Sequence, residues 1–219
     1  MARRGDLRPL PPSPTRLRFA FQDGPVDTGD PSISKLVRVP TRTLEVPSGR
    51  LVAADPFSSE LREPFSQLIP PGNYEVWMTR AYVNDHFRSA FAVLTVSDTP
   101  IASWKLLTTP RDLPVDGKPY RYIGYGVDSA LGCFCDDVAA RLHEQRFKAD
   151  EDYRAETLII NQSEWDDWGE LHPAGPSGPN LIGFSTGAGD GRYATFAGLA
   201  GDGRIAAVVT DFRIVDILE

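Results

Sequence analysis

The sequence lacks a long hydrophobic run, and that absence excludes a membrane-spanning helix. No apolar stretch among its 219 residues approaches the ~20 residues that cross a bilayer. The N-terminal stretch MARRGDLRPLPPSPTRLRF has the positive charge of a secretory leader, but it lacks the apolar core of one, and prolines interrupt it. We therefore expect a cytoplasmic protein that does not bind membranes.

Cysteine and histidine are scarce, which limits disulfide and metal chemistry. Cys133 and Cys135 are too close in sequence for an unstrained bridge, so we expect two thiols. The histidines are scattered singly, without the paired ligands that a structural zinc site requires. The sequence therefore implies no metal. Cys133 has two interpretations, a nucleophile or a buried apolar residue, and burial is favoured because free cysteine is among the most buried residue types.

An excess of positive charge is also missing. The formal net charge of -7 favours solubility and opposes binding to a phosphate backbone, so we expect no nucleic-acid partner. Arginines gather at the N-terminus, where several prolines disfavour a helix. We predict a flexible Pro/Arg-rich arm over residues 1–32 and a single globular domain over residues 33–219.

What the sequence does contain is a series of strand patterns separated by turn residues. The strand-like segments are 33–39, 49–56, 74–83, 87–96, 101–109, 180–186, 192–199 and 203–218. Residues 200–203, AGDG, predict a hairpin between the last two. We predict an α+β, predominantly β fold, with antiparallel or mixed sheets in a sandwich-like core and one or two short helices.

One strand holds a candidate binding residue. The segment FRSAFAVLTV (87–96) is apolar on both faces, which is typical of a central strand covered on each side. Arg88 inside such a strand would need a carboxylate partner.

The best helix begins near Asp136 or Asp137, which can cap free backbone N–H groups, and runs to about Lys148. Val138 and Leu142 are expected on its apolar face, in line with Phe134. A second helical segment is predicted at RAETLII (154–160).

Trp165 and Trp168 follow the second helical segment and lie three residues apart. They have two interpretations, because tryptophan is both a core filler and an interface anchor. Packing against the core is favoured over a partner-binding surface.

Two catalytic motifs fail on their context. Residues 183–187, GFSTG, match the G-x-S-x-G elbow of serine hydrolases, but no helix pattern follows and every histidine lies upstream. Residues 124–126, GYG, lack the third glycine of a dinucleotide site. A serine hydrolase is disfavoured, and no cofactor is implied.

Three aspartates remain as catalytic candidates: Asp128, Asp190 and Asp211 each follow a strand or lie in a glycine-spaced loop. If they converge at one end of a sheet, neighbouring carboxylates would push their pKa values apart, as acid–base chemistry requires. The alternative, which we favour, is that each aspartate stabilises a turn by accepting backbone N–H groups.

Several segments together carry a family resemblance. They are YGVDSALGCFCD (125–136), SGRLVAADP (48–56), PPGNYEV (70–76), FRSAFAVL (87–94) with Trp104, and the hairpin at 189–212. The first resembles the G-V-D-A-G-T-G-C-F-x-D signature of the bacterial domain of unknown function 4241 family, and the resemblance covers about residues 45–215. Here Ser129, Ala130 and Leu131 replace Ala-Gly-Thr, and Cys135 stands at a variable position. The resemblance implies a fold and a set of special positions, but no reaction.

Two classes of function remain. The first is a binding or accessory protein, immunity-like or pathway-associated, whose acidic surface would speed its encounter with a basic partner. Its partner would be an unknown protein or a small molecule. The alternative is a small cofactor-independent hydrolase, lyase or isomerase that uses the aspartates as acid and base.

Overall fold

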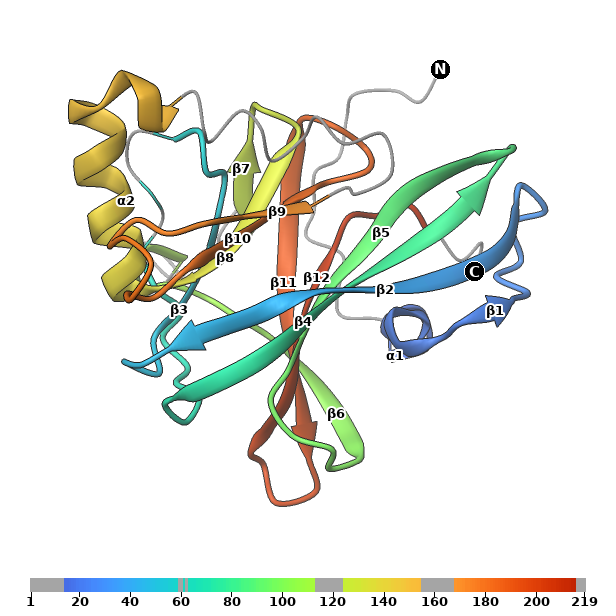
Figure 1. Ribbon diagram of the computed structural model, residues 1–219. Coiled ribbons are helices and arrows are strands. Elements are labelled where there is room, and N and C mark those ends of the chain that lie inside the picture. Colours follow the sequence, from blue (N-terminus) through green and yellow to red (C-terminus); the bar gives the residue numbers. More distant parts are fainter. Residues whose placement is uncertain (1–13, 59–60, 62, 113–123, 155–167, 216–219) are drawn as a thin grey trace.

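Two antiparallel β-sheets form the body of the protein (Figure 1). The computed structural model describes residues 14–58, 61, 63–112, 124–154 and 168–215. The prediction of a predominantly β fold with a sandwich-like core is confirmed, and the described strand pairs are antiparallel rather than mixed. None of the described helices is long and apolar enough to cross a membrane.

The larger sheet has eight strands in the order β1-β2-β4-β5-β12-β11-β6, with β7 also paired to β11. Their bounds are β1 Gly24–Pro25, β2 Ile33–Val46, β4 Gly72–Val83, β5 His86–Thr95, β6 Ile101–Leu106, β7 Tyr125–Val127, β11 Gly191–Ala200 and β12 Ile205–Asp211. The predicted hairpin joins β11 to β12, and β5 lies in the middle of the sheet.

The smaller sheet has four strands in the order β3-β8-β10-β9. They are β3 Leu51–Ala54, β8 Leu131–Asp136, β9 Trp168–Leu171 and β10 Leu181–Ser185. Because side chains alternate along a strand, Phe134 on β8 faces the larger sheet, whereas Cys133 and Cys135 face the opposite side.

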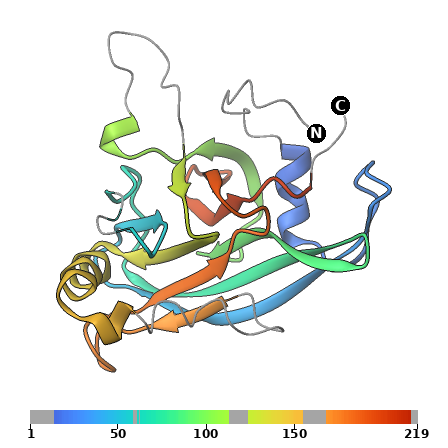
Figure 2. The ribbon, with the colours of Figure 1, turned by 90° about the horizontal axis from the view of Figure 1, so that it is seen from above.

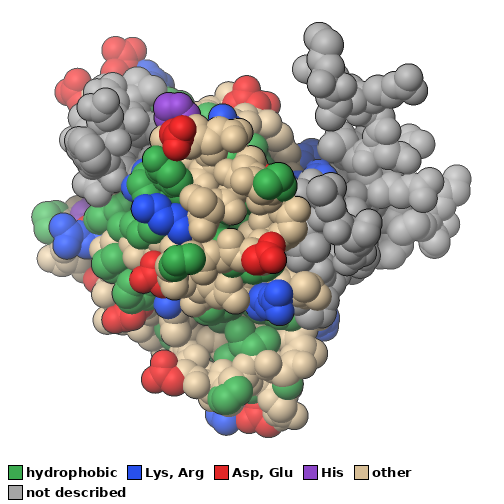
Figure 3. Space-filling view, turned by 90° about the vertical axis from the view of Figure 1, so that its right-hand side faces the viewer, with side chains coloured by type: hydrophobic (Ala, Val, Ile, Leu, Met, Phe, Trp, Pro, Cys, Tyr) green, Lys and Arg blue, Asp and Glu red, His purple; other side chains and the backbone are tan. Residues whose placement is uncertain are grey.

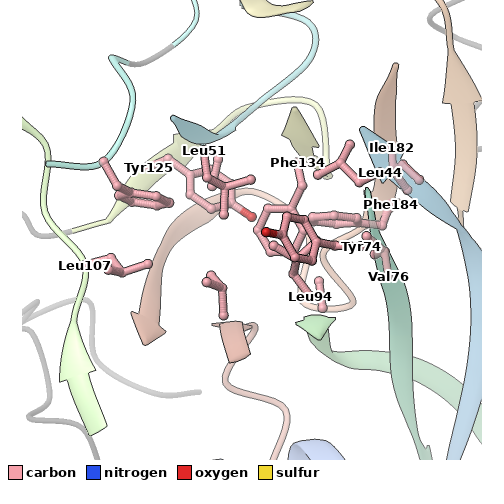
Figure 4. Packing of buried hydrophobic residues seen from close by; sticks show 14 of the residues in the cluster. Leu44, Leu51, Tyr74, Val76, Leu94, Leu107, Tyr125, Phe134, Ile182 and Phe184 are labelled. Atoms are coloured by element: carbon pink, nitrogen blue, oxygen red, sulfur yellow. The ribbon is translucent and has the colours of Figure 1, made fainter. Parts of the chain in front are cut away.

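The main core lies between the two sheets (Figure 4). The larger sheet contributes Leu44, Tyr74, Val76 and Leu94, and the smaller sheet contributes Leu51, Phe134, Ile182 and Phe184. The rings of Phe134 and Phe184 meet edge to face with centroids 5.0 Å apart.

Helix α2, Asp137–Ala149, covers the outer face of the smaller sheet. Its predicted start is confirmed, because the Asp136 carboxylate accepts from the Val138 N–H at 2.8 Å as a helix cap. The predicted apolar face is wrong: Val138 is 43% exposed. The buried helical residues are Ala139, Ala140, His143 and Phe147. The segment 154–160 lies outside the described residues except for Arg154, which is helical.

The N-terminal segment covers the outer face of the larger sheet, on the side away from α2 (Figures 1 and 2). Here α1, Pro14–Leu17, continues into the 3-10 turn η1, Arg18–Phe21. Leu17, Phe19 and Ala20 are at most 2% exposed. The expectation of a flexible arm is therefore wrong for this segment. Pro14 starts the short helix, where a missing N–H costs nothing.

Candidate functional site

The loop between β7 and β8, residues 128–130, is organised by the buried carboxylate of Asp55. Asp55 accepts from the Asp128 N–H at 2.9 Å, from the Ser129 N–H at 3.1 Å and from the Ser129 hydroxyl at 2.7 Å. It also accepts from the Phe57 N–H at 2.8 Å. Asp55 thereby joins the end of β3 to residues 128–130, which we call the signature loop. Sequence reasoning missed this role, although Asp55 lies near the end of the predicted strand 49–56.

Ala130 adopts a left-handed backbone conformation, with φ of 57°. The family signature has glycine at this position, and glycine adopts that conformation without a side-chain clash. The loop of this chain therefore keeps a left-handed residue at this position although it has alanine there in place of glycine. Alanine carries the conformation instead, which costs about 1–2 kcal/mol in an L-residue.

We predict that Ala130→Gly raises the free energy of unfolding by about 0.5–1 kcal/mol, since relief of the strain exceeds the added entropy of the unfolded chain. Urea denaturation of the purified variant measures the change. Ala139→Gly is the control, because Ala139 is helical and the same substitution there should destabilise by about 1 kcal/mol. A decrease in the free energy of unfolding of Ala130→Gly would contradict the backbone strain at Ala130.

The structure brings Asp128 and Asp190 together. In the β7–β11 ladder Val127 pairs with Gly191, so Asp128 and Asp190 are the next residues beyond this last pair. Both are exposed. Asp190 accepts from the Ala130 N–H at 3.1 Å, as expected of an aspartate that stabilises a turn.

Asp211 does not join them, which corrects the expectation that the three could converge. It is 2% exposed on the face covered by the N-terminal segment. There the Arg16 Nε donates to its carboxylate at 2.6 Å. Burial raises the pKa of Asp211, and the charge of Arg16 opposes that rise. Asp211 is thus one half of a buried ion pair.

Cys133 is buried among Val52, Ala54 and Ala139, between the smaller sheet and α2. This placement supports the apolar interpretation over the nucleophile. Its neighbour Cys135 is equally buried, and its pKa is raised well above the usual range by the hydrogen bond with Cys133 and by burial. Both thiols are free.

The proposed binding residues do not gather in one place. Arg88 is exposed at the start of β5, because burial of that strand begins only at Ser89, so its predicted burial is wrong. Trp168 is half-buried in β9, with the Arg42 guanidinium 5.7 Å from its ring centroid. Trp165 lies outside the described residues.

A polar cleft of about 850 Å³ lies beside α2. One stripe of α2 forms a wall, since Asp137, Arg141, Glu144 and Lys148 recur at helical spacing. The acidic residues of the cleft are Asp55, Glu63, Asp112, Asp137 and Glu144, and the basic ones are Arg50, Arg111, Arg141, Lys148 and Arg192. Within the described residues, no cluster of three or more His, Cys, Asp or Glu side chains is arranged to hold a metal ion.

His143 anchors α2 to the segment that carries Asp55. The side chain is fully buried, and its ring nitrogens lie 2.8 Å from the Tyr153 hydroxyl and 2.8 Å from the Pro56 carbonyl oxygen. The nitrogen facing the carbonyl must carry the proton, so the other accepts from Tyr153. Burial lowers the pKa of His143 below its ordinary value of 6.5, against the opposing effect of the Pro56 carbonyl.

The lowered pKa predicts a pH dependence of stability. As the pH falls below about 6.5, the unfolded chain binds a proton that folded His143 resists, so the free energy of unfolding decreases by up to about 1.4 kcal/mol per pH unit. In His143→Gln, whose amide can keep both hydrogen bonds, this part of the slope should vanish. Urea melts at pH 7.5, 6.5 and 5.5 measure it. Equal slopes in both proteins would contradict the assignment.

The fold and the site define a two-sheet β domain built around a strand–loop–strand signature that Asp55 holds in place. The chain belongs to a family described as "Protein of unknown function (DUF4241)", whose model matches residues 44–210. The resemblance of the signature segments is thereby confirmed. No match to the chain was found among curated proteins or among solved structures.

Proposed function

We propose that this protein is a binding or accessory protein, immunity-like or pathway-associated, and that it holds its ligand in the polar cleft beside α2. This proposal is supported by the hydrogen bonds that three carboxylates of the cleft accept from backbone N–H groups. Asp55, Asp112 and Glu144 accept backbone N–H groups from Asp128, Thr109 and Leu61 respectively. A carboxylate that holds backbone in place is poorly suited to exchange protons with a substrate.

The partner that fits this proposal is a protein or a small molecule in the cytoplasm. The buried free thiols are compatible with a reducing compartment. The net charge of -7 argues against nucleic acid and against an anionic membrane surface.

Native mass spectrometry of the full chain, purified from cells that express it, tests the proposal. The wild-type protein should retain a species of defined mass, and Arg141→Glu with Lys148→Glu should lose it. Arg204→Glu, in the β11–β12 turn away from the cleft, is the control. The recovered ligand should be chemically unchanged after incubation with fresh protein. Retention by the cleft variant would refute the proposed site.

The second candidate is a cofactor-independent hydrolase, lyase or isomerase. The observation that favours it is that two exposed aspartates, Asp128 and Asp190, directly follow the last pair of the β7–β11 ladder. Under this alternative the recovered ligand is converted to a product, and Asp128→Asn abolishes the conversion with little change in thermal midpoint. If the ligand stays unchanged with wild-type protein, the enzymatic alternative is rejected.

A further inference from the structure

We propose that the ligand of the cleft carries an oxyanion, a phosphate or a carboxylate group, held by the arginine and lysine side chains of the cleft. This inference rests on the proposed binding function and adds the chemical class of the ligand. It derives from a difference in exposure: among the described residues of the cleft, the basic side chains are more exposed than most of the acidic ones.

The basic side chains of the cleft point to solvent. Those of Arg50, Arg111 and Arg141 are 49%, 75% and 71% exposed. Lys148 and Arg192 are exposed as well. A ligand entering the cleft therefore meets cationic groups first.

Three of the acidic side chains, those of Asp55, Asp112 and Asp137, lie deeper and are bonded, whereas the Glu63 side chain is 39% exposed. Asp55 and Asp112 are 7% and 6% exposed, and the Asp137 side chain is 13% exposed. Asp137 is also shared, because Arg50 and Arg141 both contact its carboxylate, at 3.3 Å and 2.8 Å. Two guanidinium groups thus share one carboxylate at this end of the cleft, so neither has a carboxylate of its own in this contact.

Donor groups remain in excess after these bonds are counted. A guanidinium has five N–H donors, whereas Arg50 meets Asp137 through Nε and Arg141 through Nε and Nη2. Lys148 has no carboxylate partner among the residues that the structure describes. Glu63 is the exception on the acidic side: Arg111 donates to its Oε1, but its Oε2 lacks a hydrogen-bond partner in the described structure. The open donors of Arg50, Arg141 and Lys148 match a ligand rich in acceptor oxygens.

The exposed basic groups of the cleft contrast with the net charge of the whole molecule. The formal net charge is -7, and on the side away from α2 acidic and basic side chains are interspersed (Figure 3). Exposed cationic groups at a cleft raise the local concentration of anionic ligands. The oxyanion would bind within hydrogen-bonding reach of the α2 stripe.

Isothermal titration calorimetry with two probes, inorganic pyrophosphate and citrate, tests the inference on the full chain. The cleft variant is Arg50→Gln with Arg141→Gln, which removes two exposed groups and leaves the buried bonds intact. The matched control is Lys105→Gln with Arg204→Gln, an equal change in charge on exposed side chains outside the cleft. We expect the cleft variant to bind at least about 10-fold more weakly and the control to bind as wild type does. Affinity should fall as salt rises.

The outcomes separate the sources of the oxyanion. Binding of pyrophosphate alone assigns a phosphate ligand, binding of citrate alone assigns a carboxylate ligand, and binding of both assigns general oxyanion recognition. If neither probe binds the wild-type protein at millimolar concentration, or if both double variants weaken binding equally, the inference is overturned. Cleft-dependent retention of a ligand in native mass spectrometry would then still stand, so the two proposals fail separately.

Discussion

Deletion of residues 1–30 should remove most of the free energy of unfolding. The segment Pro14–Phe21 fills the outer face of the larger sheet, and its loss exposes the buried neighbours Phe91, Phe196 and Val209. Withdrawal of Leu17 and Phe19 forfeits about 1.5–3 kcal/mol each. The deletion also removes the ion pair between Arg16 and Asp211, whose carboxylate is then open to water. Together with the exposure of Phe91, Phe196 and Val209, this loss reaches the lower end of the stability of an ordinary domain, about 5–15 kcal/mol.

The measurement is a urea titration of the full chain beside two truncated proteins, one starting after residue 12 and one starting after residue 30. The shorter truncation keeps every residue named above and is the control. A truncation after residue 30 that melts with the same midpoint as its control would show that the segment contributes nothing to the fold.

Arg16 and Asp211 also give a point-mutation test of the same surface. Arg16→Leu alone leaves the buried Asp211 carboxylate without its cationic partner. Arg16→Leu combined with Asp211→Asn also removes the negative charge, so the double variant should be more stable than the single variant. The raised pKa of Asp211 points the same way: the neutral form is favoured by burial.

The sequence predicts those parts of the fold that short-range patterns determine. Alternation and turn residues identify the β11–β12 hairpin, and Asp136 marks the start of α2 because a helix cap is a local interaction. The left-handed residue of the signature loop also falls where the family resemblance places a glycine, at Ala130.

The sequence patterns did not predict contacts between residues that are distant in the chain. Arg16 and Asp211 are 195 residues apart, so nothing local marks either as a partner of the other. The apolar face of α2 was misassigned because Phe134 belongs to β8, where the period is two, so its spacing to Val138 carries no helical phase. The helix instead packs through Ala139 and Ala140, whose small side chains let it approach the sheet closely.

The candidate site was only partly accessible to the same reasoning. The aspartates of the signature loop could be identified as special, and the register places Asp128 beside Asp190. The cleft itself could not be predicted, because its walls come from segments as distant as Arg50, Arg111 and Arg192. The exposure of each charged side chain in the cleft depends on tertiary packing, and the spacing of residues in the sequence does not predict it.

Asp55→Ala should destabilise the protein by about 3–5 kcal/mol and loosen the signature loop. The carboxylate accepts four hydrogen bonds, from the N–H groups of Phe57, Asp128 and Ser129 and from the Ser129 hydroxyl. A buried donor left without its acceptor costs about 1–3 kcal/mol, more where the acceptor was charged. Hydrogen exchange should then show lost protection at the Asp128 and Ser129 amides.

Asp190→Ala is the matched control for that experiment. Asp190 is exposed and accepts a single bond, from the Ala130 N–H, so its loss should cost about 0.5–1 kcal/mol and leave the Asp128 and Ser129 amides protected. Because Asp55 also lines the cleft, its replacement should weaken ligand retention together with stability. If instead Asp55→Ala melts like wild type and only retention is lost, Asp55 contacts the ligand directly, and the signature loop serves recognition rather than the architecture of the fold.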